Sequence, residues 1–158
     1  MISIKGRGIV VLWNALECDH SIIAAGFESI GLKGFIPNPR TKLASLLHAL
    51  KQVYCGQTWL IRPLKGKNGY QVVKETKGME ANDLEHERSF IMFEDESMTV
   101  SPFDQTLVDR VSQEYKKASG RVSPIELTDC LRRMLTSPHS GFNGIPLKDA
   151  GAVYWVSE

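Results

Sequence analysis

The chain has 158 residues, of which 42% are hydrophobic and 23% charged, and its formal net charge is +1. This apolar content excludes a disordered polymer, and the length suits one globular domain over residues 1–158. The longest apolar run, Ile9–Trp13, is far shorter than the roughly 20 residues of a membrane helix. Since the first residues also lack the pattern of a secretory signal, we expect a cytoplasmic protein with no membrane partner.

The first elements are a strand and two helices. β-Branched residues predict a strand over Gly8–Trp13. A helix begins near Asp19, with Ile23, Phe27 and Ile30 on one face, and ends at the glycines that follow. After an extended, proline-containing stretch, Thr41 is expected to cap a second helix that ends before Gly56. The apolar stripe of this second helix consists of Leu43, Leu46, Leu47, Leu50, Val53 and Tyr54.

A β-hairpin is predicted next. The strands Trp59–Leu64 and Tyr70–Lys74 flank the segment KGKNG. The Asn68-Gly69 pair readily accepts positive φ angles, as tight hairpin turns require. Pro63 cannot donate a hydrogen bond to a neighbouring strand, so we expect it at a sheet edge or a bulge.

The second half predicts further strands and two helices. The acidic segment 78–88 is a loop or the entry to a strand, and residues 89–100 hold two strands around an acidic turn at Glu94–Glu96. Ser101 is expected to cap a helix with Pro102 at its first position and Asp104 near its positive end. Ser123 and Glu126 have the spacing of a capping box. The inward face of the helix that follows is predicted to contain Ile125, Leu127, Cys130, Leu131 and Met134.

Residues 152–156 form a terminal strand of strong β-formers. Strands and helices therefore cluster along the chain rather than alternate. This order favours an α+β fold: a mostly antiparallel sheet of about four to six strands, with about four helices packed as a single layer on one face.

Three cysteines, Cys18, Cys55 and Cys130, lie far apart in the sequence. Their odd number and wide spacing favour buried free thiols in a reducing compartment over a disulfide framework. No cysteine has a nucleophile signature, and no closely spaced ligand pairs indicate zinc. We therefore expect no catalytic residue, no metal site and no cofactor from these motifs.

Charge is divided unevenly along the chain. Residues 1–78 carry eleven basic and four acidic side chains, while the remainder carries eight basic and fourteen acidic ones. Such asymmetry is typical of a polyanion-binding half, or of two halves that complement each other. The leading hypothesis is a non-enzymatic, macromolecule-binding protein that contacts nucleic acid through this basic N-terminal half. The candidate contacts are Arg7, Arg40, Lys42, Arg62, Lys65 and Lys67, with Trp59 and Tyr70 as stacking platforms.

Two alternatives remain open at this stage. The chain could be a protein-interaction module, such as an inhibitor, an adaptor or an oligomeric subunit, that uses the acidic segment 80–96 or the terminal strand. It could also be a metal-dependent nuclease, since Asp83, Glu85 and Glu87 would share one face of an extended strand.

Three phrases carry a resemblance to a known group of proteins: GLKGFIPNPRTKLASLLHAL, LIRPLKGKNGYQVVKE and LKDAGAVYWV. They resemble an uncharacterised family of phage- and plasmid-associated proteins, over most of the chain. The shared positions are Phe35, Pro37, Pro39, Arg62, Pro63, Gly69, Tyr70, Gly151, Tyr154 and Trp155. The resemblance implies a mobile-element setting and no particular activity.

Overall fold

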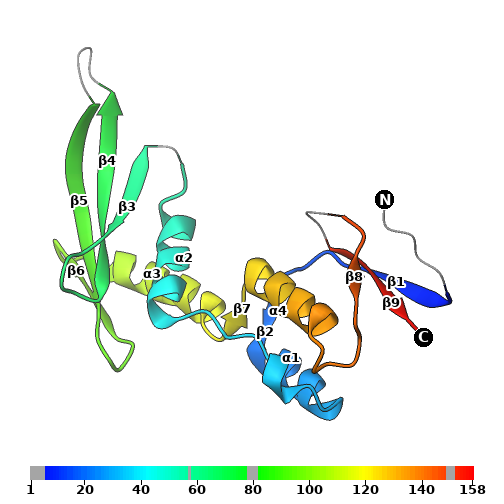
Figure 1. The fold of residues 1–158 in the computed structure, drawn as a ribbon. Helices are drawn as coiled ribbons and strands as arrows, with labels where there is room; N and C mark the ends of the chain where they lie inside the picture. Colours follow the sequence, from blue (N-terminus) through cyan, green and yellow to red (C-terminus); the bar gives the residue numbers. More distant parts are fainter. Residues whose placement is uncertain (1–5, 57, 78–81, 149–151) are drawn as a thin grey trace. The chain divides into compact units, whose positions relative to one another are not determined.

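The computed structural model describes residues 6–56, 58–77, 82–148 and 152–158. Over these residues the chain has an α+β fold with four α-helices, one 3₁₀ helix and nine strands in three antiparallel sheets (Figure 1). The predicted fold class is therefore confirmed. The strands that we expected in one sheet are divided among three, because the first and last strands pair with each other rather than with the hairpin.

The elements follow the order strands, helices, strands, helix, strand, helix, strands. They are β1 (Gly8–Leu12), β2 (Cys18–Asp19), α1 (His20–Ser29), η1 (Lys33–Phe35), α2 (Lys42–Val53), β3 (Trp59–Pro63), β4 (Gly69–Lys77), β5 (Asn82–Met92), β6 (Met98–Ser101), α3 (Gln105–Ala118), β7 (Arg121–Val122), α4 (Pro124–Thr136), β8 (Ile145–Pro146) and β9 (Val153–Ser157). None of the described helices combines the length and the apolar character that a membrane crossing requires.

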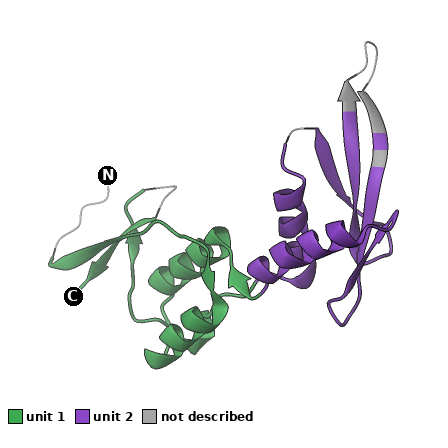
Figure 2. Cartoon of the chain, turned by 180° about the vertical axis from the view of Figure 1, so that it is seen from behind, with its two compact units in different colours: residues 1–39, 120–158 green, residues 40–119 purple. Residues whose placement is uncertain are grey.

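The chain divides into two compact units (Figure 2). The central unit is Arg40–Ser119, and the terminal unit combines Met1–Pro39 with Gly120–Glu158. The central unit is therefore inserted into the sequence of the terminal unit. The composition of the sequence does not indicate linkers at the two boundaries. The expectation of a single domain stays a prediction, since two units of one chain can unfold together or separately.

The central unit contains a four-stranded sheet in the order β3-β4-β5-β6. Helices α2 and α3 share a core with this sheet. The buried members of the core are Leu46, Ala49 and Leu50 from α2, Val72 from β4, Phe90 and Met92 from β5, Val100 from β6, and Val111 and Tyr115 from α3. Of the apolar stripe predicted for α2, Leu46 and Leu50 supply the core, and Val53 and Tyr54 pack against it. Leu43, in the first turn of the helix, is exposed, so the prediction is wrong for this residue.

The terminal unit has two small sheets, β1-β9-β8 and β2-β7, together with α1, η1 and α4. Cys130 of α4 is fully buried, and its thiol donates a hydrogen bond to the Phe35 carbonyl oxygen at 2.8 Å. Burial raises the pKa of this thiol, which makes it inert, as the sequence predicts. All three cysteines are free, but Cys55 is exposed and Cys18 half-buried, so the prediction of burial is wrong for these two.

Two helix caps agree with the sequence and one differs. The Thr41 and Ser123 hydroxyls accept hydrogen bonds from the backbone N–H groups of Ala44 and Glu126. The third helix, α3, is capped by Asp104 and not by Ser101. Ser101 instead closes β6, because the strand continues up to Pro102.

The hairpin β3–β4 forms as predicted, but its turn differs in detail. The positive φ angle belongs to Gly66 (67°) and not to the Asn68-Gly69 pair. Gly69 is instead the first residue of β4 and is buried. A Cβ atom at Gly69 would collide with the Phe90 carbonyl oxygen, so glycine is needed here for the close approach of β5.

Other differences concern single residues or short pairings. Ile30 and Ile125 were expected on buried helix faces and are exposed, because Ile30 lies past the end of α1 and Ile125 lies in the first turn of α4. For the acidic segment, a loop and the entry to a strand were both open, and residues 82–88 form the first part of β5. The short strands β2, β7 and β8 were not predicted, since two residues carry no periodicity.

Candidate functional site

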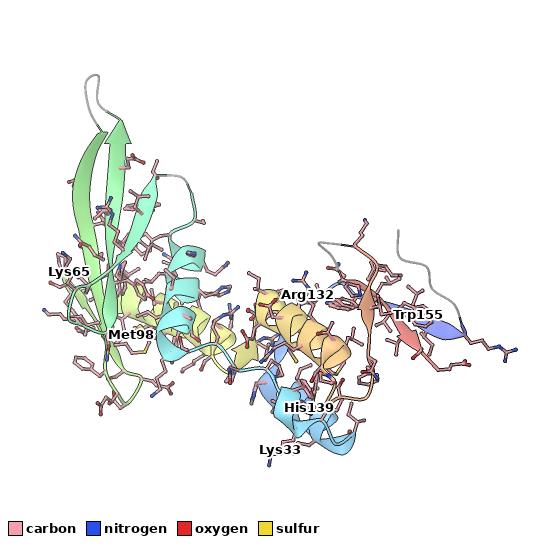
Figure 3. The ribbon with its side chains drawn as sticks, in the orientation of Figure 1. Lys33, Lys65, Met98, Arg132, His139 and Trp155 are labelled. Atoms are coloured by element: carbon pink, nitrogen blue, oxygen red, sulfur yellow. The ribbon has the colours of Figure 1, made fainter. Side chains whose placement is uncertain are left out.

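The basic turn between β3 and β4 holds half of the predicted nucleic-acid contacts. Lys65 and Lys67 are exposed in the turn, and Arg62 is exposed on β3 opposite Gln71. Lys65 is labelled in Figure 3. The turn is closed by a hydrogen bond from the Leu64 N–H to the Gly69 carbonyl oxygen at 3.0 Å. The structure thus brings these three cations to one end of the hairpin.

An acidic turn lies directly beside the basic one. The Met92 N–H donates to the Asn68 carbonyl oxygen at 2.8 Å, which joins the end of β5 to the turn that contains Lys65 and Lys67. The carboxylates Glu94–Glu96 follow immediately after β5. Charges of both signs therefore meet at this end of the sheet.

Lys42 contacts the acidic turn as well. Its ammonium group donates to the Glu94 carbonyl oxygen at 3.0 Å. The pKa of Asp95 lies below its ordinary value, mainly because the Ser97 hydroxyl and N–H donate to this carboxylate, with a smaller contribution from the charge of Lys42. Part of the positive charge predicted for polyanion binding is therefore balanced locally.

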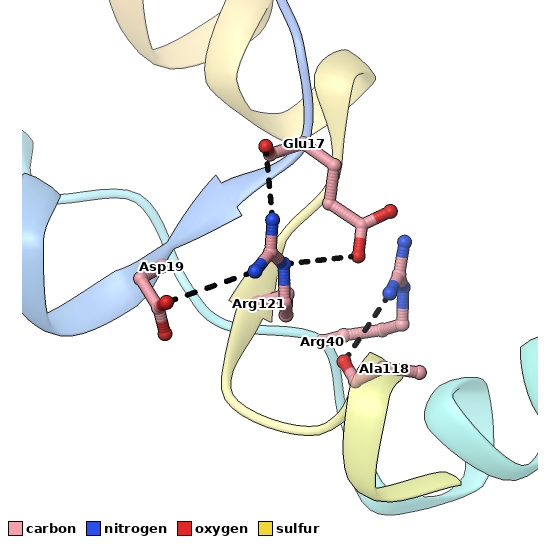
Figure 4. A network of polar contacts seen from close by, with 5 residues as sticks. All are labelled: Glu17, Asp19, Arg40, Ala118 and Arg121. Carbon is pink, nitrogen blue, oxygen red and sulfur yellow. Dashed lines mark hydrogen bonds and ion pairs between the residues drawn. The ribbon is translucent and has the colours of Figure 1, made fainter. Parts of the chain in front are cut away.

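The remaining two predicted contacts, Arg40 and Arg7, lie outside the hairpin, and Figure 4 shows Arg40. The Arg40 guanidinium donates to the Ala118 carbonyl oxygen, at the last residue of α3, at 3.2 Å. Arg7 belongs to the terminal unit, where it is exposed just before β1. The six predicted cations are thus distributed over two units, and the described contacts do not join them into one cluster.

The two structural units are each close to neutral. Residues 40–119 contain twelve basic and eleven acidic side chains, and the rest of the chain contains seven of each. The charge asymmetry between the sequence halves disappears because the acidic segment folds into β5, in the same sheet as the basic hairpin. Complementation within one unit accounts for the pattern.

The two predicted stacking aromatics pack toward the core. The Trp59 ring lies edge-on to Tyr54 with 5.2 Å between centroids, and Lys74 Nζ lies 6.0 Å from the Trp59 centroid. Tyr70 is half-buried beside the same core, and this burial raises the pKa of its phenol. Both rings therefore have structural packing partners.

The acidic residues considered for a nuclease do not follow strict alternation. The β4–β5 register shifts between Val72 and Val73, which pair with Arg88 and His86, so Glu87 has no partner in β4. This bulge breaks the common face expected for Glu85 and Glu87. The Asp83 side chain lies outside the described residues. Among the side chains that are described, no three His, Cys, Asp or Glu residues are grouped closely enough to hold a metal ion.

The ion pairs around Arg121 hold the β2–β7 sheet (Figure 4). Arg121 Nε lies 3.2 Å from Glu17 Oε1, and its Nη1 lies 3.6 Å from Asp19 Oδ2. Its Nη2 also donates to the Glu17 carbonyl oxygen at 3.2 Å. One guanidinium thus contacts two carboxylates of the segment around β2, so Arg121 acts as a structural clamp between β2 and β7.

Strand β1 is the candidate site that the sequence did not single out. The terminal strand, which the sequence suggests as an interaction surface, is β9, and it lies between β1 and β8. The edge is β1, and no described strand pairs with its outer side. The available signal is the uncharged apolar run Ile9–Trp13, which by itself predicts a strand but not its place in the sheet.

The hydrogen-bond pattern shows which β1 groups face outward. The Arg7 carbonyl oxygen accepts from the Glu158 N–H at 3.2 Å, and the Trp13 N–H donates to the Ala152 carbonyl oxygen at 3.3 Å. In an antiparallel pair, residues bonded to the partner alternate with residues whose N–H and C=O groups point away. Since Arg7 and Trp13 bond to the β9 side, the outward groups belong to Gly8, Val10 and Leu12.

The side chains of β1 leave apolar surface exposed on both faces of the sheet. Ile9 is 62% exposed on one face, while Val10 and Leu12 are 52% and 72% exposed on the other. The strand is anchored by Trp13, whose ring stacks on Tyr154 with 5.5 Å between centroids and 14° between planes. An accessible edge therefore coincides with apolar side chains above and below it.

The other sheet edges carry features that discourage pairing. β3 has Arg62 and Pro63, β8 is two residues long and ends in Pro146, and β6 has four residues. β5 before Ser89 extends past β6, but its segment 82–88 is rich in charged residues. Charges, prolines and short strands are the usual protection of an edge, and β1 has none of them between Gly8 and Leu12.

No protein-family model, no curated protein and no solved structure matches this chain. The resemblance to phage- and plasmid-associated proteins therefore stays a prediction, and function has to be argued from the site itself.

Proposed function

We propose that this chain is a protein-interaction module that adds an extended strand of its partner to the outer edge of β1. The observation that carries the proposal is the outward N–H and C=O groups of Gly8, Val10 and Leu12, flanked by exposed apolar side chains. Strand addition is a general mode of recognition in which backbone bonds provide affinity and alternate side chains provide specificity.

The energetics define what kind of strand would bind. Three outward residues offer up to six hydrogen bonds, worth about 0.5–1.5 kcal/mol each, or roughly 3–9 kcal/mol together. Association itself costs about 4–15 kcal/mol. Near the middle of these ranges, about 6 against about 9 kcal/mol, the backbone bonds do not cover the cost of association. Burial of the side chains, at about 1.5–3 kcal/mol each, then makes up the difference. The partner strand is consequently apolar on at least one face.

A peptide of alternating Val and Thr, with lysines at both ends and a fluorescent label, tests this proposal by anisotropy. Val10→Pro is expected to abolish binding, because it removes an outward N–H while leaving the bonds to β9 in place. Ile22→Lys is the matched control, since Ile22 is an apolar residue that is 71% exposed on α1 and does not belong to β1. Circular dichroism verifies that both variants fold. Absence of peptide binding to the unmodified chain, at any concentration at which it is monomeric, refutes the proposal.

Nucleic-acid binding is the second candidate function. It is favoured by the exposure of Arg62, Lys65 and Lys67 around one turn. The double variant Lys65→Glu and Lys67→Glu is expected to weaken binding to labelled DNA and RNA and to reduce its dependence on salt. If the unmodified chain binds neither polymer at low ionic strength, this candidate is excluded.

A further inference from the structure

We propose that the partner strand is β1 of a second copy of the chain, paired antiparallel about a two-fold axis through Val10. This inference rests on the proposed function, because it names the occupant of the same edge. The result would be a continuous six-stranded sheet in the order β8-β9-β1-β1-β9-β8.

The outward backbone groups select this register. A two-fold axis perpendicular to the sheet has to pass opposite a residue of β1, so that this residue faces its own counterpart. An axis at Val10 pairs Val10 with Val10 and Gly8 with Leu12, in both directions, and all three outward residues are bonded. Within β1, an axis at Ile9 or Val11 bonds only two of the three outward residues. The Val10 register therefore forms the most hydrogen bonds between the two strands.

The side chains fit the same register on the face that contains Trp155. Residue Gly8 has no side chain, and the Trp155 ring occupies the space above it: an added Cβ would lie 2.6 Å from Trp155 ring atoms. In the Val10 register, Leu12 of the second copy lies opposite Gly8 and meets this ring. The 72% exposed Leu12 thus gains an aromatic contact in each copy.

The opposite face is complementary as well. Ile9 lies opposite Val11 of the second copy, so two β-branched side chains meet across the strands, a favourable cross-strand pair. Since Ile9 is exposed and Val11 half-buried, pairing removes apolar surface from water on this face too. Pairing of the two β1 strands therefore covers apolar side chains on both faces of the sheet.

The ends of the strand explain why a second copy suits this edge. Arg7 is the only charged residue in the stretch 6–14. It lies opposite Trp13 of the second copy, where a guanidinium can approach an aromatic ring. The two Arg7 residues lie at opposite ends of the pair, about 20 Å apart at roughly 3.3 Å per residue, so they do not repel at close range.

The experiment is sedimentation equilibrium over a concentration series, combined with a charge exchange at Val10. The unmodified chain is expected to form a dimer as its concentration rises. Val10→Lys alone and Val10→Glu alone are expected to raise the dissociation constant about tenfold or more, because like charges would face each other across the axis. An equimolar mixture of the two variants is expected to recover the dimer, since an ammonium group then meets a carboxylate at the centre of the pair. Ile22→Lys is expected to dimerise as the unmodified chain does.

Each other outcome overturns a defined part of the inference. A chain that stays monomeric but binds the Val/Thr peptide refutes the second copy as partner and leaves the proposed function intact. A chain that does neither refutes both. A dimer that Val10→Lys and Val10→Pro leave unchanged shows association through another surface. Two monomeric charge variants that fail to associate when mixed refute the register centred on Val10.

Discussion

Replacement of Phe90 by alanine is the sharpest test of how the chain is stabilised. Phe90 is fully buried at the centre of the four-stranded sheet, paired with Tyr70 on one side and Val100 on the other. The Tyr54 ring also meets it edge-on, with 6.1 Å between centroids. Among the described residues, Phe90 is the largest side chain that is fully buried.

The expected loss follows from this enclosure. A buried Phe→Ala replacement costs about 3–5 kcal/mol, from lost transfer free energy plus the cavity that remains. If the central unit unfolds by itself, at about 4–8 °C per kcal/mol for its size, its Tm falls by roughly 12–40 °C. If the whole chain unfolds as one, at about 2–4 °C per kcal/mol, the Tm falls by roughly 6–20 °C.

Calorimetry and hydrogen exchange separate these cases. When the two units unfold together, Phe90→Ala accelerates exchange in β9 as much as in β5. When they unfold separately, acceleration is confined to residues 40–119, and the expectation of a single domain is wrong. Phe103→Ala is the control, because Phe103 is 71% exposed and should cost less than about 1 kcal/mol. A loss below about 1 kcal/mol from Phe90→Ala would refute the assigned core.

Two further predictions concern the same unit. Gly69→Ala is expected to lower the free energy of unfolding, measured in urea, by about 1–3 kcal/mol or more, because the added Cβ would collide with the Phe90 carbonyl oxygen. Gly26→Ala on α1 is the control: its Cβ meets no atom within 4 Å, so the replacement should be neutral or stabilising. Equal effects of the two replacements would contradict the close approach of β4 and β5 at Gly69. Burial, and next the hydrogen bond to the Glu96 carboxylate at 2.8 Å, raise the pKa of Tyr115 above its ordinary value of 10.0. The unfolded state therefore loses this proton first, so stability is retained below about pH 10 and falls as the pH rises through the folded pKa. Tyr115→Phe should make this fall less steep, and an unchanged slope would count against the assignment.

Local signals in the sequence determined most of the elements. The spacing of Leu46 and Leu50 in α2, the caps Thr41 and Ser123, and the two strands that flank the KGKNG turn are signals that act over three to eight neighbouring residues. They can therefore be interpreted without knowledge of the fold, although the sequence placed the positive φ angle at Asn68-Gly69 and not at Gly66. The same signals predicted the α+β class. These signals predict element boundaries less well where two of them compete. At Ser101, a serine before a proline is compatible both with a helix cap and with the end of a strand, and the structure has the strand end.

Tertiary structure alone decided the pairing of distant segments. β1 bonds to β9, which makes β1 rather than the terminal strand the edge. The acidic segment folds beside the basic hairpin, so the charge asymmetry of the sequence gives two nearly neutral units. Neither result can be derived from the order of residues, because strand pairing depends on hydrogen bonds and apolar contacts between segments that lie far apart along the chain. The sequence determines which segments can form strands, and only the folded chain determines which strand is left with an open side.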